Sequence, residues 1–200
     1  RIRMQRAQQS LINLGLVVRV EDYADIDTDE IARALTEPGQ KCYDEIVRIF
    51  GDAILDGNRR IDRDRLRERV FDNADERHRL EDILHPRIRV IVRDKLAAIE
   101  APYVIVVVPL LIESGFTDLV DRVLVVDTLE NVQIQRTAAR SGLSEPEIRK
   151  IMSAQASRAQ RLQLANDLIE NNGDRKQLEA EVERMHQWYL SLATTTKKTN

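Results

Sequence analysis

The stretch "PYVIVVVPLLIE", residues 102–113, decides the predicted fold class. Its first part is a continuous run of apolar, mostly β-branched side chains between Pro102 and Pro109. Such a run predicts a strand that is covered on both faces, as the strands of a parallel sheet are. A second run of this kind, "RVLVVD", occupies residues 122–127. Together the two runs predict a buried sheet.

Helices and a further strand are predicted after the second run. One helix is predicted between Asp127 and Gly142, and Ser144–Glu147 has the pattern of a capping box with a proline in the first turn. Leu168–Ile169 fits a short last strand, and Asp174 opens a final helix. Because strands alternate with helices, the sequence predicts an α/β fold with a largely parallel sheet.

The segment before the apolar runs is charged and helical. Its apolar spacing predicts helices over residues 31–35, 43–50, 62–70 and 76–99. We expect a break in the last of these helices at His85-Pro86, because a proline disfavours helical backbone at the residue before it. The chain has the length of one domain, so we interpret Glu30–Ile99 as an inserted, lid-like lobe.

The composition limits the classes of protein. The 200 residues are 42% hydrophobic, but no stretch approaches the run of about 18 apolar residues that spans a membrane. A net charge of −3 gives no general attraction to nucleic acid or to an anionic membrane. The single cysteine, Cys42, excludes an internal disulfide, and without a signal-peptide pattern we expect a cytoplasmic protein. The sequence does not specify an oligomeric state.

Three carboxylates alternate with Ile26 and Thr28 in "DIDTDEIARALTEPG", residues 25–39. If they end a strand, Asp25, Asp27 and Asp29 point to one side. Ligands of open α/β sheets bind beyond the carboxyl ends of the strands, where such carboxylates suit Mg²⁺ or a general base. Capping of a helix is the alternative. Capping needs only one carboxylate, so we favour a functional pair at Asp27 and Asp29.

Two other groups of polar side chains leave alternatives open. Asp127 directly precedes a predicted helix, and we favour a helix cap there over a ligand contact. Arg136 and Arg140 lie one helical turn apart and share a face. Arginine suits phosphate binding, and a solvated charged face is the alternative. Further arginines follow at positions 149, 158 and 161.

Several stretches together resemble the dephospho-coenzyme A kinase family. They occur in the family's order from about Asp25 to Ala193. The resemblance implies a parallel-sheet P-loop kinase core in a single domain of residues 1–200. It also implies a coenzyme-A-binding helical lobe over about residues 31–96 and a helical lid over about residues 141–157. The stretches are "DIDTDEIARALTEPG", "DRDRLRERVFDNADERHRLEDILHP", "APYVIVVVPLLIESG", "DRVLVVD", "QIQRTAARSGLSEPEIRKIMSAQASRAQRLQLANDLIENNG" and "MHQWYLSLA".

The resemblance also implies a reaction and its partners. It implies transfer of a phosphoryl group from ATP, with Mg²⁺, to the ribose 3′-hydroxyl of dephospho-coenzyme A. This reaction is the last step of coenzyme A biosynthesis. The expected partners are therefore these two small molecules, without nucleic acid or membrane.

The same resemblance implies roles for individual residues. Asp29 is expected to be the base, and Asp27 to place the metal-bound phosphates. Arg136 and Arg140 are expected at the nucleotide. The expected substrate-binding residues are His85, Pro109 and Leu110. Taken alone, a histidine in an apolar segment favours a packed, structural side chain over a catalytic acid.

One element of the family pattern is not found in the sequence. Kinases of this type hold nucleotide phosphates with a G-x-x-x-x-G-K-[ST] loop. Here the first lysine is Lys41 and the first glycine is Gly15, so residues 1–24 contain no such loop. Three explanations stay open: a misassigned start, a binding protein or impaired paralogue on the kinase scaffold, or another way of holding ATP. A smaller departure is Asn166, where the family has an acidic residue.

Overall fold

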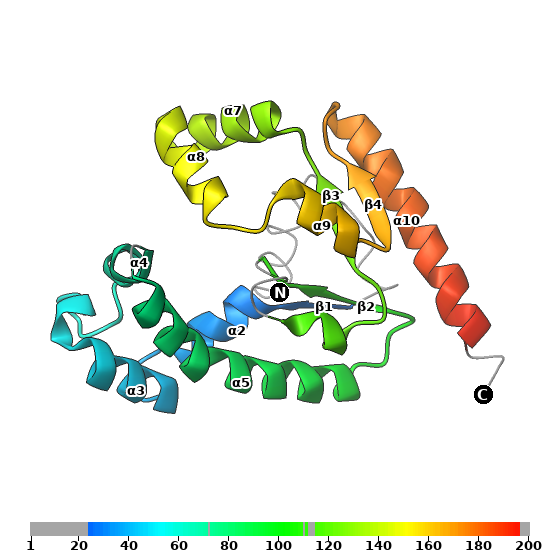
Figure 1. The fold of residues 1–200 in the computed structure, drawn as a ribbon. Helices are drawn as coiled ribbons and strands as arrows, with labels where there is room; N and C mark the ends of the chain where they lie inside the picture. The colour runs from blue at the N-terminus through cyan, green and yellow to red at the C-terminus, as the bar shows by residue number, and fades with distance from the viewer. Residues whose placement is uncertain (1–23, 72, 110, 112–114, 197–200) are drawn as a thin grey trace. The chain divides into compact units, whose positions relative to one another are not determined.

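A computed structural model describes residues 24–71, 73–109, 111 and 115–196 of the chain (Figure 1). The chain divides into two compact units. Among the described residues, unit 1 holds 24–25, 100–105, 111 and 115–196, and unit 2 holds 26–71, 73–99 and 106–109. The architecture is mixed α/β, as the sequence predicts.

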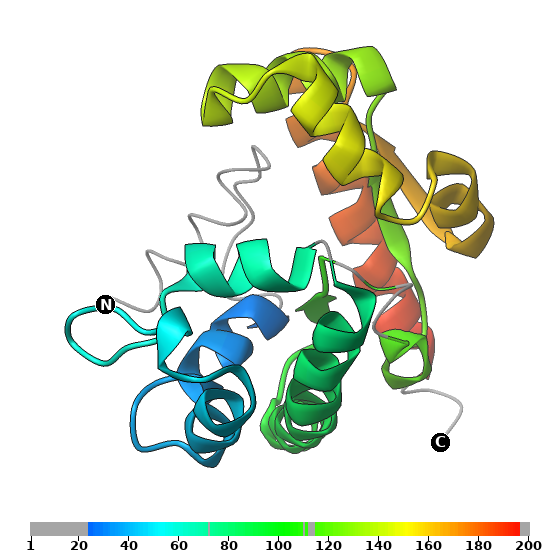
Figure 2. The same ribbon diagram turned by 60° about the vertical axis from the view of Figure 1, so that its left-hand side comes forward.

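Unit 2 consists mainly of helices. They are α2 (Thr28–Leu35), α3 (Lys41–Phe50), a short 3₁₀ helix (Asp52–Ile54), α4 (Arg63–Phe71) and α5 (Ala74–Ala98). The long helix α5 packs against α2, α3 and α4, and Figure 2 shows these helices side by side. Their shared core is apolar. Its most buried members include Cys42, Ile46, Phe50, Ile54, Leu66 and Ile83.

Helix α3 shows how the local sequence sets this packing. Cys42, Ile46 and Phe50 recur every fourth residue, so all three lie on the buried face. The helix ends at Gly51, which has a φ of 75°. A residue without Cβ adopts this angle at little cost. The N–H of Gly51 donates to the Val47 carbonyl at 2.8 Å, and this bond closes the last turn.

The predicted break at His85-Pro86 is wrong. Helix α5 runs without interruption from Ala74 to Ala98 and contains Pro86. Proline removes one helical hydrogen bond, and one local and one long-range contact of Arg87 offset that loss. Arg87 Nη1 donates to the Ile83 carbonyl at 2.7 Å, while its Nη2 donates to Glu45 of α3 at 2.6 Å. Buried Ile83 and Ile88 flank the proline, so packing holds the helix together on both sides of it.

Truncation of the core of unit 2 should be costly. Ile46 is completely buried, and Ile46→Ala should lower the free energy of unfolding by about 2–5 kcal/mol through lost burial and a cavity. The matched control is Ile49→Ala in the same helix, because Ile49 is 38% exposed. Urea denaturation followed by circular dichroism measures both. Equal losses for the two variants would contradict the assigned core.

Unit 1 contains a pair of strands with helices. Strand β3 (Leu124–Asp127) pairs in parallel with β4 (Asp167–Glu170), with Leu124 opposite Asp167 and Asp127 opposite Glu170. The helices are α7 (Glu130–Ser141), α8 (Glu145–Ser153), α9 (Arg158–Leu164) and α10 (Arg175–Thr196), and a short 3₁₀ helix covers Phe116–Leu119. The parallel pairing confirms the prediction of parallel strands.

Helix α10 covers the strand pair of unit 1. Leu178, Val182 and Met185 of α10 pack with Ile169 of β4 in a buried cluster. The prediction of a final helix after Asp174 is confirmed. The capping box at the start of α8 is also confirmed, because the Ser144 N–H donates to Glu147 Oε2 at 2.8 Å.

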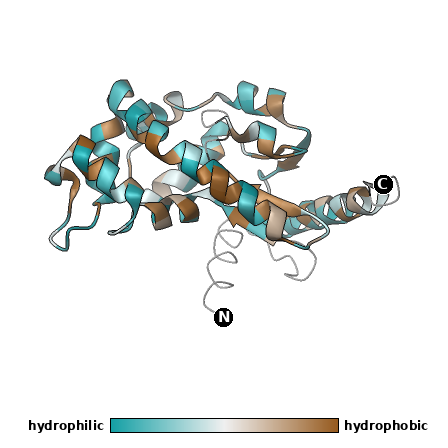
Figure 3. Cartoon of the chain, turned by 90° about the horizontal axis from the view of Figure 1, so that it is seen from below, coloured by the Kyte–Doolittle hydropathy of each residue, from teal (hydrophilic) through white to brown (hydrophobic). Residues whose placement is uncertain are grey.

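The remaining strands, β1 (Ala24–Asp27) and β2 (Val104–Val107), form a second two-stranded sheet. In the described part of the chain the strands therefore form two two-stranded sheets and not one continuous sheet. Figure 3 shows hydrophobic and hydrophilic residues alternating along the helices, as expected for helices with one packed face. None of the helices within the described ranges is long and apolar enough to cross a membrane.

Candidate active site

The paired carboxylates lie where β1 passes into α2. Asp27 ends the strand, and Oδ1 of its side chain accepts a hydrogen bond from the Asp29 N–H at 2.8 Å. Asp27 is thus the N-cap of α2, and Asp29 lies in the first helical turn. The expected strand alternation through Asp29 is wrong, because the helix already begins at Thr28. The cap nevertheless brings the two carboxylates together.

The start of α2 is fixed to the end of β2. Thr28 is buried, and its Oγ1 donates to the Val107 carbonyl at 3.0 Å. The carboxylates flank this anchored residue, so their backbone is held by a strand and by the first turn of a helix. A general base needs such a fixed position relative to the proton that it accepts.

The surroundings of Asp29 raise the pKa of its carboxyl above the ordinary value. Desolvation of the carboxyl is the largest cause, although the residue as a whole is exposed, and the negative charge of Asp27 is the second. The positive charges of Arg33 and Arg63 act in the opposite direction. A raised pKa brings a carboxylate closer to the strength that a base needs near neutral pH.

Asp27→Asn should lower the pKa of Asp29, because it removes the second cause of the upward shift. Asparagine caps helices as well as aspartate does, so α2 should keep its first turn. The titration of the Asp29 carboxyl should therefore move to lower pH. Titration of the Asp29 carboxyl carbon by NMR measures the shift. An unchanged pKa would show that the two carboxylates do not interact.

The expected substrate-binding residues lie in different elements. His85 lies half-buried in the middle of α5, and Pro109 is exposed two residues beyond the end of β2. Leu110 lies outside the described residues. Val107 at the end of β2 accepts the hydrogen bond from Thr28. Pro109, two residues later, therefore follows the strand that holds the start of α2. The structure does not test the three proposed roles, which stay predictions.

The arginines belong to unit 1. Arg136 on α7 donates from Nη1 to the Asn171 carbonyl at 2.9 Å and from Nη2 to the Gly173 carbonyl at 3.5 Å. Both carbonyls lie within three residues of the end of β4, so Arg136 lies at the carboxyl end of a parallel strand, where ligands bind in open α/β sheets. Arg140 lies one turn further along α7 and is exposed.

Asp127 does not cap the helix that follows it, so the cap prediction is wrong. Helix α7 begins only at Glu130, and its N-cap is Leu129. Instead, buried Asp127 accepts hydrogen bonds from Arg158 Nε at 2.8 Å and from Arg158 Nη2 at 2.5 Å. The side-chain hydrogen bond from Arg158 holds the pKa of Asp127 below its ordinary value. The pairing could not be predicted from spacing, because 31 residues separate the partners.

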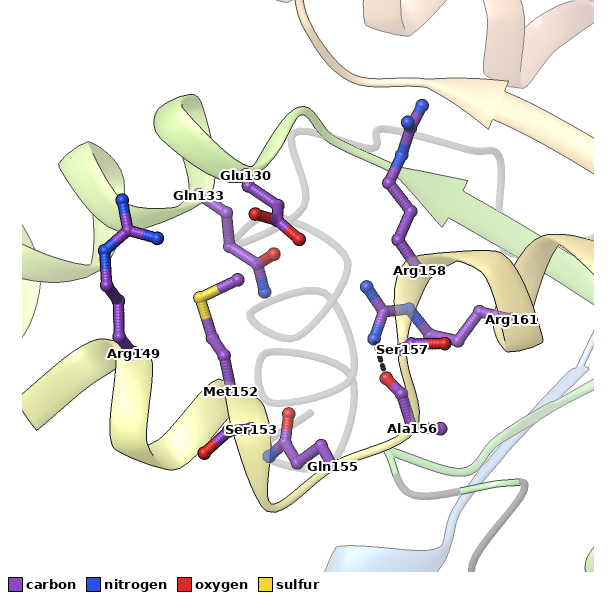
Figure 4. A pocket seen from close by; sticks show the side chains of 10 residues that line it. All are labelled: Glu130, Gln133, Arg149, Met152, Ser153, Gln155, Ala156, Ser157, Arg158 and Arg161. Atoms are coloured by element: carbon purple, nitrogen blue, oxygen red, sulfur yellow. Dashed lines mark hydrogen bonds between the residues drawn. The ribbon is translucent and has the colours of Figure 1, made fainter.

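A pocket of about 290 Å³ lies between α7, α8 and α9 (Figure 4). It brings together the three later arginines of the sequence. Arg149 is paired with Glu145 at 2.8 Å, and Arg161 Nη1 donates to the Ala156 carbonyl at 2.5 Å. The lining residues are Glu130, Gln133, Arg149, Met152, Ser153, Gln155, Ala156, Ser157, Arg158 and Arg161. Arginine side chains in a pocket lining suit an anionic ligand, although here two of the three are paired with carboxylates.

The donor set for a metal is limited. Within the described ranges, no three His, Cys, Asp or Glu side chains are grouped to hold a metal ion. Mg²⁺ in nucleotide enzymes is bound by one or two carboxylates together with substrate phosphates and water. The pair Asp27 and Asp29 fits that smaller donor set, because the cap occupies only one oxygen of Asp27.

The fold has counterparts among solved structures. The crystal structure of TT1252 from Thermus thermophilus matches with a TM-score of 0.70 and 30% identity over 82% of this chain and 83% of that chain. The dephospho-CoA kinase from Campylobacter jejuni matches with a TM-score of 0.61 and 24% identity over 90% and 88% of the two chains. The fold is therefore that of an α/β kinase of the P-loop type.

Sequence comparison identifies the family. The family model for dephospho-CoA kinase matches residues 16–177. The dephospho-CoA kinase of Thiobacillus denitrificans is 47% identical over 169 residues, which cover 84% of each chain. That of Nitrosomonas europaea is 44% identical over 189 residues, which cover 94% of this chain and 90% of the relative. The chain belongs to the dephospho-CoA kinase family, whose members are phosphotransferases that use ATP.

Proposed function

We propose that this protein transfers the γ-phosphoryl group of Mg-ATP to the ribose 3′-hydroxyl of dephospho-CoA, giving CoA and ADP. The observation that carries the proposal is the anchored carboxylate pair, Asp27 and Asp29, in a chain of the dephospho-CoA kinase family. The raised pKa of Asp29 supports its role as the base.

The chemical step assigns a task to each carboxylate. The 3′-oxygen attacks the γ-phosphorus, the bond from that phosphorus to the β–γ bridging oxygen breaks, and the hydroxyl proton passes to Asp29. The electron pair of the broken bond leaves with ADP. Asp27 would hold the metal ion that accompanies ATP through a carboxylate oxygen. When bound, that ion neutralises charge on the phosphates.

Other segments would bind and enclose the substrates. We assign ATP binding to Arg136 and Arg140, and dephospho-CoA binding to the helical lobe of about residues 31–96 with His85, Pro109 and Leu110. The arm of about residues 141–157, which contains α8, would close as a lid. Closure excludes water and so favours transfer to the hydroxyl over hydrolysis of ATP. A cytoplasmic location stays a prediction from the sequence.

The test is transfer from radiolabelled Mg-ATP to dephospho-CoA, with the product identified by mass spectrometry. The 200 residues contain no G-x-x-x-x-G-K-[ST] loop, so the test uses both this chain and a version in which such a loop precedes β1. The matched control is an acceptor that lacks the ribose 3′-hydroxyl and should remain unlabelled.

Each outcome is informative. Label on dephospho-CoA and not on the 3′-deoxy acceptor supports the proposal. Label on both acceptors contradicts the assigned site of transfer. Binding of dephospho-CoA without transfer by either version would favour the alternative of a binding protein or impaired paralogue on the kinase scaffold.

A further inference from the structure

The ion pair between Asp127 and Arg158 lies at the carboxyl end of β3. The Asp127 side chain is 4% exposed, and it receives Nε and Nη2 of one guanidinium in a two-pronged arrangement. The Arg158 side chain is 38% exposed, so the cost of desolvation falls mainly on Asp127 and offsets part of what the pair gains. Stability alone is therefore a weak reason for this pair, and its geometry suggests a second task.

The same strand ends hold both Arg158 and Arg136. The Asn171 N–H donates to the Asp127 carbonyl at 2.8 Å, and the Asn171 carbonyl accepts from Arg136 Nη1 at 2.9 Å. A short chain of hydrogen bonds thus connects an arginine of α9, the ends of β3 and β4, and an arginine of α7. Both guanidinium groups are placed at the strand ends where ligands of α/β proteins bind.

Arg158 also lines the pocket between α7, α8 and α9 (Figure 4). Asp127 accepts from the Nε and Nη2 edge of the guanidinium, and Nη1 donates to no acceptor among the described residues. A planar guanidinium that is fixed along one edge keeps donors on another edge for a phosphate oxygen. Glu130 is the acidic member of the lining and opposes an anion. Of the three lining arginines, Arg149 and Arg158 are paired with carboxylates, whereas Arg161 donates to the neutral carbonyl of Ala156.

We propose that Asp127 is a positioning residue, which holds Arg158 so that its remaining N–H groups bind a phosphate oxygen of ATP in this pocket. The identity of the ligand rests on the proposed function. Without Asp127, Arg158 would keep its charge but lose its orientation. A catalytic group displaced by about 1 Å can cost up to about 100-fold in rate.

The chain supplies a matched control for the ion pair. Arg122 and Asp167 form another two-pronged pair in unit 1, with Nε to Oδ2 at 2.7 Å and Nη2 to Oδ1 at 2.9 Å. The Asp167 side chain is 9% exposed, and Asp167 begins β4, whereas Asp127 ends β3. The two pairs are therefore similar in chemistry but lie at opposite ends of the same strand pair.

The experiment compares Asp127→Asn, Arg158→Lys, the double variant and Asp167→Asn, each made in this chain and in the loop-bearing version. ATP affinity is measured by calorimetry, kcat and KM by phosphoryl transfer, and Tm by thermal unfolding. We expect both aspartate variants to lower Tm. Only Asp127→Asn should also weaken ATP binding and lower kcat/KM for ATP, by about 10- to 100-fold. Adding it to Arg158→Lys should cost little more, because the two residues act as a unit.

Equal ATP affinity and equal kcat/KM for the two aspartate variants would overturn the proposal. So would a full additional loss when Asp127→Asn is added to Arg158→Lys. If neither version transfers phosphate, the proposed function fails, and ATP affinity alone decides the role of Asp127. In that case weaker binding by Asp127→Asn than by Asp167→Asn supports the role, and equal binding or no ATP binding overturns it.

Discussion

Asp29→Asn should lower kcat for phosphoryl transfer by about 10²- to 10⁴-fold, the range that a positioned general base contributes. The amide keeps the size of the side chain but cannot accept the hydroxyl proton. The helix cap should survive, because it uses the backbone N–H of residue 29 and the side chain of Asp27. Steady-state transfer from radiolabelled Mg-ATP measures kcat, and calorimetry should show nearly unchanged ATP affinity.

Glu30→Gln is the matched control for this variant. Glu30 is an exposed carboxylate in the same first turn of α2, so its loss changes the local charge without removing the assigned base. We expect Glu30→Gln to keep its kcat. An unchanged kcat in Asp29→Asn, or equal losses in the two variants, would remove Asp29 from the role of base.

Arg136→Ala should raise KM for ATP by about 10- to 100-fold, the effect of losing a charge-assisted hydrogen bond of about 1.5–3 kcal/mol. The guanidinium is held by the carbonyls of Asn171 and Gly173 at the end of β4. Initial rates over a range of ATP concentrations measure KM. KM for dephospho-CoA should change less, because we assign that substrate to the helical lobe.

The control for Arg136 is Arg175→Ala. Arg175 is an exposed arginine of α10 that pairs with Glu179 at 2.8 Å, and it lies outside the assigned nucleotide site. Its removal should leave KM for ATP unchanged. If Arg136→Ala also leaves KM for ATP unchanged while Tm falls, Arg136 serves only to fasten the loop after β4.

Local patterns were sufficient to predict most elements of unit 1. The apolar run that ends at Asp127 forms β3, and the short run at Leu168–Ile169 lies within β4. Each is a local signal of consecutive apolar side chains, although in β4 only Ile169 is buried and Leu168 is exposed. Helix α10 could be predicted in the same way, since its buried residues repeat with helical spacing.

Errors arose where a distant partner overrides the local preference. Pro86 predicts a break, but Arg87 reaches back to Ile83 and across to Glu45, which is 42 residues away in the sequence. Asp127 predicts a cap, but its side chain is taken by Arg158. The contacts of Arg87 with Glu45 and of Arg158 with Asp127 join residues that are 42 and 31 positions apart, so the local sequence could not reveal them.

The carboxylate pair was the part of the site most open to prediction. An Asp-x-Asp sequence between a strand and a helix contains one more carboxylate than capping requires, and the structure places one as the cap and the other beside it. The start of α2 at Thr28 was missed, because Thr28 is fixed by its bond to Val107, 79 residues away. The desolvation of Asp29 likewise depends on packing and not on sequence neighbours.

The most direct test of the central claim is the rate of phosphoryl transfer from Mg-ATP to dephospho-CoA by this chain and by the loop-bearing version, measured side by side. The loop supplies several charge-assisted hydrogen bonds to the ATP phosphates, each worth about 1.5–3 kcal/mol. We therefore predict that the loop-bearing version forms CoA at a rate well above that of the chain as it stands. Absence of CoA formation by both versions would contradict this prediction.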